Sequence, residues 1–145
     1  MVNASSQVAQ PISIIVEGEP CPWQVYTRQG RPSAGVLAFQ AYQTLIQLAI
    51  KRVWADSPLT GPVDLSLQFY RSIPAACPKT HPARAHWIAK HRMMRPDLSN
   101  FCKAAEDAIK GPGLLILDDS QVVSLSAMKA YSVKGPHTVI RVYQL

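Results

Sequence analysis

Residues 63–73 alternate apolar and polar side chains more clearly than any other stretch of the chain. Val63, Leu65, Leu67 and Phe69 occupy the apolar positions. A period of two predicts a β-strand with one buried face and one outward face. Such a strand needs neighbours in a sheet and an apolar layer over its buried face. This one segment therefore predicts a sheet with one buried face.

Three other segments have strand-like sequences. They are residues 12–16, 122–131 and 138–143, each rich in β-branched or alternating apolar residues. Lys134, Gly135 and Pro136 stand between the last two segments and are typical of a turn. We therefore expect the last two strands to form a hairpin.

Two segments have apolar residues at helical spacing, residues 34–54 and 98–110. Ser33 is placed to cap the first helix, and Gly111 and Gly113 end the second. The first helix should be structural, with this apolar face: Leu37, Tyr42, Leu45, Ile46, Leu48, Ala49, Ile50 and Val53. The stripe of the second helix is Leu98, Phe101, Cys102, Ala105 and Ile109. The elements predict an α+β fold: one domain, residues 11–145, with a mixed, mostly antiparallel sheet covered by two helices, after a flexible tail of residues 1–10.

The chain is basic, with 15 Lys and Arg against 9 Asp and Glu and a net charge of +6. This balance favours a polyanionic partner, of which nucleic acid is the commonest, although a basic surface can also serve solubility alone. No apolar run is long enough to span a membrane, and the polar N-terminus is unlike a signal peptide. Three widely spaced cysteines indicate a reducing, cytoplasmic setting.

Residues 74–96 contain no acidic side chain. We expect a mobile loop that clamps a phosphate backbone. Its basic residues are Lys79, Arg84, Lys90, Arg92 and Arg95. A second loop, residues 21–33, offers Arg28 and Arg31 beside Trp23 and Tyr26, for contacts to phosphates and bases or for packing of the rings on the sheet. A zinc site from Cys77, His81, His86 and His91 is disfavoured, because their spacing matches no common ligand pattern.

Residues 95–123 hold five of the nine acidic residues. Helical spacing puts Ser99, Asn100, Lys103 and Asp107 on one face, with Asp97 at the entrance of the helix. Phosphodiester hydrolysis needs carboxylates to hold Mg²⁺ and a cation to stabilise charge on the phosphate. Asp97, Asp119 and Lys103 supply that set. Taken singly, Asp97 is better explained as a helix cap, and Asp118 with Asp119 as a solvated turn between strands.

The same stretch resembles the RusA-like endodeoxyribonucleases, the Holliday junction resolvase family of phages and prophages. The family pattern D-x-D-N-x-x-K opens a helix and corresponds here to residues 97–103, which read DLSNFCK. The later pattern D-D-x-x-V corresponds to residues 118–122, which read DDSQV. The helix body 103–109 and the segment Gly18-Glu19-Pro20, followed by a basic loop and a long helix, are also similar to the family. The resemblance spans nearly the whole chain.

The resemblance implies a Mg²⁺-dependent endonuclease, with Mn²⁺ as a substitute, that cuts branched DNA in recombination and repair. It implies a homodimer, because a four-way junction offers two symmetric strands. Asp97, Lys103 and Asp119 would be catalytic. Asp97, Asp118 and Asp119 would bind the metal, and Ser99 and Asn100 would support them. The basic residues of the two loops would bind DNA.

One position departs from the family pattern, because Ser99 replaces its second aspartate. The site loses a negative charge, and its metal affinity should fall unless Asp118 or Glu106 compensates. Trp23, Gln24 and Val25 also stand where many relatives are more basic. A DNA-binding protein of the same fold with impaired catalysis is therefore the alternative.

Overall fold

The computed structural model describes residues 10–24 and 33–145. In chain order the elements are β1 (Ile12–Glu17), α1 (Ala34–Val53), β2 (Val63–Ser72), α2 (Ala83–His91), α3 (Leu98–Ile109), the 3₁₀ turn η1 (Asp119–Gln121), β3 (Val122–Ser132) and β4 (His137–Gln144). The four strands form one sheet in the order β1-β4-β2-β3. The β1–β4 and β4–β2 pairs are antiparallel, and β2 pairs parallel with β3. The predicted α+β fold with a mixed sheet is confirmed.

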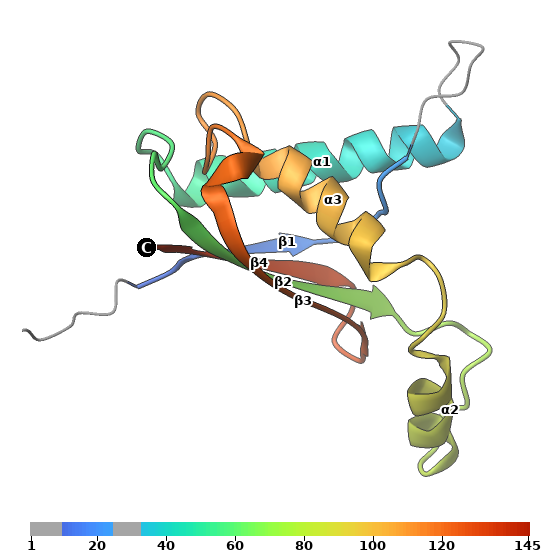
Figure 1. Cartoon of the computed structure of the whole chain (residues 1–145). Helices are drawn as coiled ribbons and strands as arrows, with labels where there is room; N and C mark the ends of the chain where they lie inside the picture. The colour runs from blue at the N-terminus through green and yellow to red at the C-terminus, as the bar shows by residue number, and fades with distance from the viewer. Residues whose placement is uncertain (1–9, 25–32) are drawn as a thin grey trace, which may run out of the picture.

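The core lies between the sheet and the two helices α1 and α3, which cover the same face (Figure 1). The alternating residues of β2 point into it, and Leu65, Leu67 and Phe69 are fully buried. The Phe69 ring stacks on Phe101 of α3 with 5.2 Å between the ring centroids. The apolar stripe predicted for α3 is confirmed, which turns its polar residues away from the core.

Helix α1 begins as predicted, since the Ser33 hydroxyl accepts a hydrogen bond from the Val36 N–H at 3.2 Å. Its buried face is narrower than the predicted one and includes Val36 and Phe39. Four residues of the predicted face are exposed instead: Leu37, Leu45, Leu48 and Val53. A helix on one side of a sheet buries a single stripe. The expected face was therefore too wide.

The predicted hairpin of the last two strands is wrong. β2 lies between β3 and β4 and pairs with both. Residues 133–136 therefore step over the end of β2, a gap of two strand spacings, or about 10 Å. Gly135 makes this step with a positive φ of 97°. The turn was recognised correctly, but its sequence could not show that a third strand fills the gap.

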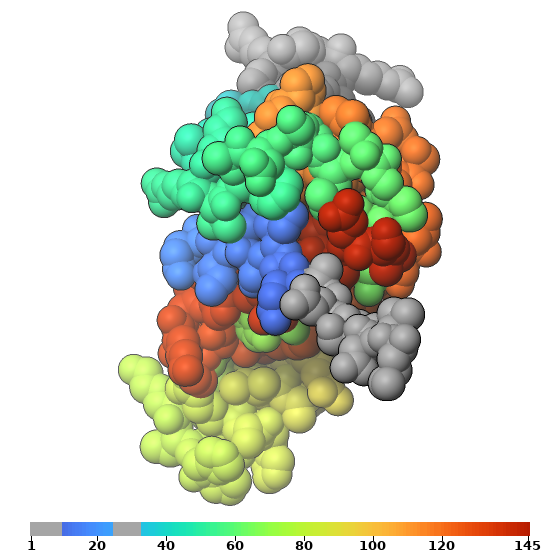
Figure 2. Space-filling view, turned by 90° about the vertical axis from the view of Figure 1, so that its left-hand side faces the viewer, coloured from blue at the N-terminus to red at the C-terminus, as the bar shows by residue number. Residues whose placement is uncertain are grey.

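The prediction of an uninterrupted loop at residues 74–96 is also wrong, because the segment contains α2. No residue of α2 is buried. The helix projects from one end of the molecule, away from the layers of sheet and helices (Figures 1 and 2). Without a buried stripe it leaves no apolar periodicity in the sequence. Within the described part of the chain, no helix is long and apolar enough to cross a membrane.

Candidate active site

Asp97 stands at the N-terminal end of α3, and its side chain makes no capping hydrogen bond. Its backbone carbonyl instead accepts from the N–H groups of Asn100 and Phe101 at 3.1 and 3.3 Å. The residue is exposed. Asp97 thus occupies the cap position without using its carboxylate there. Among the described residues, nothing engages these carboxylate oxygens.

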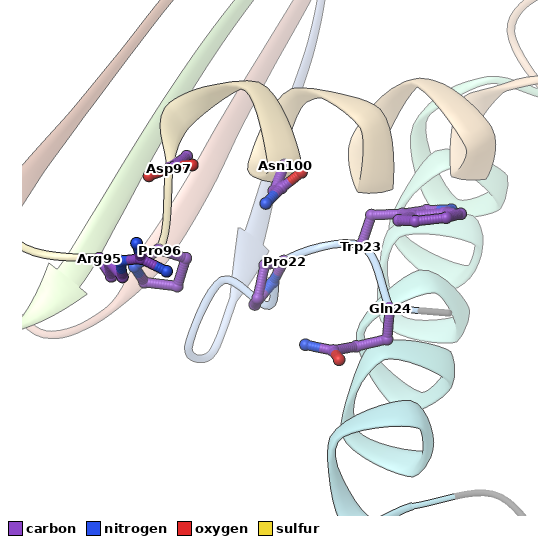
Figure 3. Close-up of a pocket in the computed structure, with 7 residues that line it drawn as sticks. All are labelled: Pro22, Trp23, Gln24, Arg95, Pro96, Asp97 and Asn100. Atoms are coloured by element: carbon purple, nitrogen blue, oxygen red, sulfur yellow. The ribbon is translucent and has the colours of Figure 1, made fainter. Parts of the chain in front are cut away.

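A cavity of about 340 Å³ opens beside this end of α3. It lies between α3, the segment that precedes α3, and residues 18–24, which follow β1 and are called the arm below (Figure 3). The lining residues are Pro22, Trp23, Gln24, Arg95, Pro96, Asp97 and Asn100. One carboxylate, one guanidinium and two amides therefore face the same space. A carboxylate suits a hard cation, and a guanidinium suits a phosphate.

Lys103 lies one turn further along α3, beside this cavity. Its Nζ is 3.6 Å from the centroid of the Trp23 ring. This is within the range of a cation–π contact. Within the described ranges, Lys103 forms no ion pair with a carboxylate. The site is thus bordered by a lysine that is held by an aromatic ring and not by a carboxylate.

The Asp118–Asp119 segment forms the turn η1. The Asp118 carboxylate accepts a hydrogen bond from the Ser120 N–H at 2.8 Å, and the Gln121 side chain accepts one from the Asp118 N–H at 3.0 Å. The bonds from Ser120, helped by Lys110, hold the pKa of Asp118 below its ordinary value. Gln121 also donates to the Leu59 carbonyl at 2.6 Å. Asp118 is therefore an ionised, exposed group on a well-ordered turn.

Asp119 forms an ion pair with Lys110, at the C-terminal end of α3. Lys110 Nζ is 2.9 Å from Asp119 Oδ2 and 3.6 Å from Asp107 Oδ1. The hydrogen bond to Asp119 raises the pKa of Lys110 above its ordinary value, with burial opposing and the charges of Asp119 and Asp107 adding to the rise. One lysine thus balances two carboxylates at this end of the helix.

Glu106 faces a second cavity, of about 510 Å³, between α3 and β3. Its pKa is raised first by burial, then by the charges of Asp119 and Asp107, with Lys110 opposing. Ser99 lines the same cavity, two turns earlier on α3. Glu106 is therefore a carboxylate that shares a cavity with Ser99, the serine that replaces the second aspartate of the family pattern.

The predicted site residues fall into two groups. Asp97, Asn100 and Arg95 share the first cavity, and Lys103 lies next to it. Asp119 is paired instead with Lys110 at the other end of α3. The helix separates Lys110 from Asp97 by about 20 Å. In the described part of the chain, no three His, Cys, Asp or Glu side chains are grouped to hold a metal ion. Neither the four candidate zinc ligands nor the three aspartates therefore form such a group.

The predicted DNA-binding residues are only partly described. Arg28 and Arg31, with Tyr26, lie outside the described residues. On the segment 74–96, these side chains are exposed: Lys79, Lys90, Arg92 and Arg95, while Arg84 of α2 is half-buried. The segment thus keeps its basic surface, although it is partly helical.

The protruding α2 is fixed to the end of β3 by contacts that the sequence did not indicate. Trp87 stacks on His91 at 4.0 Å between centroids and contacts Tyr131 at 5.8 Å. Lys129 Nζ donates to the carbonyls of Met94 and Pro96 at 3.0 and 2.9 Å. These bonds tie down the chain just before Asp97. The end of β3 therefore contacts both the basic segment and the chain that leads into α3.

Two contacts in the site were missed from the sequence: that of Trp23 with Lys103, and that of Lys110 with Asp119. Trp23 and Lys103 are 80 positions apart, so no local pattern could pair them. Lys110 follows Asp107 by three residues, a helical ion-pair spacing that the sequence does offer. Its contact with Asp119 depends on how η1 folds back.

Comparison with known proteins gives two matches. The family model for endodeoxyribonuclease RusA matches residues 23–143. The uncharacterized protein YqaN of Bacillus subtilis (strain 168) is 27% identical over 133 residues, covering 83% of this chain and 88% of YqaN. The matched range includes α3, η1 and the arm residue Trp23.

Proposed function

The chain belongs to the RusA endodeoxyribonuclease family, and we propose on that basis that it is a Mg²⁺-dependent endonuclease that cuts branched DNA, such as the four-way junctions of recombination and repair. One observation carries the proposal: the entrance of α3 presents an unengaged carboxylate, Asp97, beside two cations, Arg95 and Lys103. The carboxylate attracts a divalent cation, and the two cations attract a phosphodiester. In this proposal, residues 11–145 form the nuclease domain.

Mg²⁺, with Mn²⁺ as a substitute, fits the donors that are present. Mg²⁺ takes oxygen ligands and is commonly held by one or two carboxylates, with water and substrate phosphate completing its shell. Asp97 and Asp119 would hold it and Asp118 would assist, all three being exposed. When bound, the ion supplies the Lewis acidity that activates water and polarises the phosphate. Because Lys110 lies about 20 Å from Asp97 along α3, Asp119 can share this ion only if it leaves Lys110 and η1 moves along the helix towards Asp97 when metal and DNA bind.

The other residues either contact the DNA or support Asp97. Lys103 Nζ donates hydrogen bonds to a phosphate oxygen and stabilises the negative charge that develops there. Asn100, with Ser99, supports Asp97 from the first turn of α3. The remaining cations hold the phosphate backbone: Arg28, Arg31, Lys79, Arg84, Lys90, Arg92 and Arg95.

A homodimer in the cytoplasm completes the proposal. A two-fold dimer would present two sites to two symmetric strands. In support, β3 is the last strand of the sheet and exposes apolar side chains, with exposed fractions of 60% for Val123, 46% for Leu125 and 40% for Met128. The three cysteines are free, which suits a reducing compartment.

The test is cleavage of a synthetic four-way junction in Mg²⁺ or Mn²⁺, comparing the wild type with Asp119→Asn. We expect paired symmetric cuts by the wild type and a large loss in the variant. Equal cutting by both proteins would refute the assignment of Asp119. Absence of cutting at every metal concentration would refute the enzymatic function.

A second candidate function rests on Ser99, which leaves the site with one carboxylate fewer than the family pattern. The protein would then bind junctions or duplexes in a salt-dependent way without cutting them. Ser99→Asp separates the two candidates. A large gain in cleavage would identify the natural site as impaired, and an unchanged rate would identify serine as a working variant.

A further inference from the structure

Lys103 is held by an aromatic ring and not by a carboxylate. Its Nζ lies 3.6 Å from the centroid of the Trp23 indole. Two carboxylates stand one turn further along α3: Asp107 is ion-paired with Lys110 at 3.6 Å, and Glu106 lines the cavity on the β3 side of the helix. The two lysines of α3 are thus fixed by different chemistry.

An aromatic partner has a consequence that a carboxylate would not have. A carboxylate would neutralise the ammonium and compete with a phosphate for it. The face of an indole attracts the ammonium through its quadrupole and leaves the charge intact. A phosphate oxygen can therefore bind to Lys103 without displacing an anion.

Trp23 is itself fixed by the backbone. Its N–H donates to the Asn100 carbonyl at 3.0 Å, and Asn100 is one turn before Lys103 on α3. Its ring is half-buried and packs against the core. The arm is also held at its start, because the Gly18 N–H donates to the Pro136 carbonyl at 3.1 Å and Glu19 accepts from Ser72. The start of the arm and the backbone of Trp23 are thus both fixed, and Figure 3 shows the ring lying beside α3.

We propose that Trp23 is a positioning residue, which holds the Lys103 ammonium beside the cavity at the entrance of α3 so that it meets the scissile phosphate. This inference rests on the proposed function, since it takes Lys103 as the group that stabilises the phosphate. Trp23 then acts through Lys103 and needs no contact with DNA.

The first test requires no catalysis. The ε-methylene protons of Lys103 should be shifted upfield in NMR spectra by the ring current of Trp23, relative to those of Lys51 on α1. The shift should disappear in Trp23→Leu and largely persist in Trp23→Phe, which keeps an aromatic face. An unshifted Lys103 signal in the wild type, or the same shift in Trp23→Leu, would overturn the proposal.

The second test uses single-turnover cleavage of a four-way junction at saturating protein. Trp23→Leu should lower the rate about fivefold, and Trp23→Phe should restore most of it. The dissociation constant for the junction, measured without divalent cation, should change less than about twofold. Thermal unfolding of both variants checks that each is folded.

A double-variant comparison decides whether Trp23 acts through Lys103. Trp23→Leu should slow cleavage when it is introduced into the wild type. It should leave the rate of cleavage unchanged when it is introduced into Lys103→Ala. Losses that multiply would overturn the proposal, because Trp23 would then act independently. If the wild type does not cut, the proposed function fails, and the NMR test still decides whether Trp23 holds Lys103.

Discussion

The two ends of α3 carry similar charged side chains in opposite states. At the C-terminal end, Lys110 is bonded to both Asp119 and Asp107. At the N-terminal end, Asp97 has no side-chain partner among the described residues, and Lys103 rests on the Trp23 ring. A charge that is paired inside the protein has to leave its partner before it can bind a ligand. Charges that are held in place but left unpaired are available to a ligand.

The difference arises from what reaches each end. The turn η1 brings the Asp119 carboxylate to Lys110, so an anion meets a cation. The arm after β1 brings a tryptophan to Lys103. It also brings the Gln24 amide to the cavity that Asp97 lines (Figure 3). The arm comes from a distant part of the chain, whereas η1 folds back from only nine residues beyond Lys110. The helix supplies the spacing, and its neighbours decide which charges stay open.

The largest effect should follow from Asp97→Asn. We expect junction cleavage to fall by about a thousandfold or more, because a neutral amide is a poor ligand for a hard cation. Stability should change little, since the exposed Asp97 side chain makes no capping hydrogen bond that the variant could lose. Single-turnover rates and melting temperatures measure the two effects. A variant that cuts at the wild-type rate would remove the open end of α3 from the active site.

Lys103→Ala should have the next largest effect. Loss of one charge-stabilising donor typically lowers the rate about a hundredfold to a thousandfold. Lys103 is exposed and Ala favours helix, so the free energy of unfolding should change by less than about 0.5 kcal/mol. Lys103→Arg keeps the charge and serves as the matched control. If stability fell and the rate did not, Lys103 would belong with the structural charges.

Local patterns in the sequence predicted most of the fold and the residues at the open end. The alternation of residues 63–73 and the stripe of α3 are each set by one buried face, and both were confirmed. The hairpin failed because β2 inserts between β3 and β4, a long-range choice that a turn sequence does not encode. α2 was missed because it buries no residue.

The site divides in the same way. Asp97, Asn100 and Lys103 could be placed on α3 by helical spacing alone. The contact of Trp23 could not, because the arm comes from far along the chain. The pairing of Lys110 with Asp119 could not, because it depends on how the irregular segment between α3 and η1 folds back. Sequence spacing therefore located the charged groups but not their partners. Those partners distinguish the two ends of the helix.

A smaller effect is expected at the paired end, from Lys110→Met. The exposed ion pairs should contribute about 0.5 kcal/mol to the free energy of unfolding, and the rate of cleavage should change less than about twofold. Because the pKa of Lys110 is raised, this stabilisation is present below its ordinary value of 10.5 and disappears as pH rises through the raised value. Urea unfolding at pH 7 and above pH 11 measures the difference. A tenfold loss of cleavage would contradict the division between the two ends.

The smallest effect should come from Glu106→Gln. The raised pKa means that the ionised Glu106 opposes folding, an effect that develops as pH rises through the raised value and is absent below the ordinary value of 4.5. The variant should therefore melt about 1 °C higher at pH 7 and at the wild-type temperature at pH 4. Thermal scans at both pH values test this. A large loss of cleavage would instead assign Glu106 to the metal site in place of the carboxylate that Ser99 lacks.

The most direct test of the open end is a crystal structure of the protein soaked with Mn²⁺, with the metal located by anomalous scattering. We predict a peak bound to the Asp97 carboxylate, with Asp119 turned from Lys110 towards it. A peak elsewhere with none at Asp97, or a gap between Asp97 and Asp119 too wide for one ion to bridge, would contradict the proposed metal site.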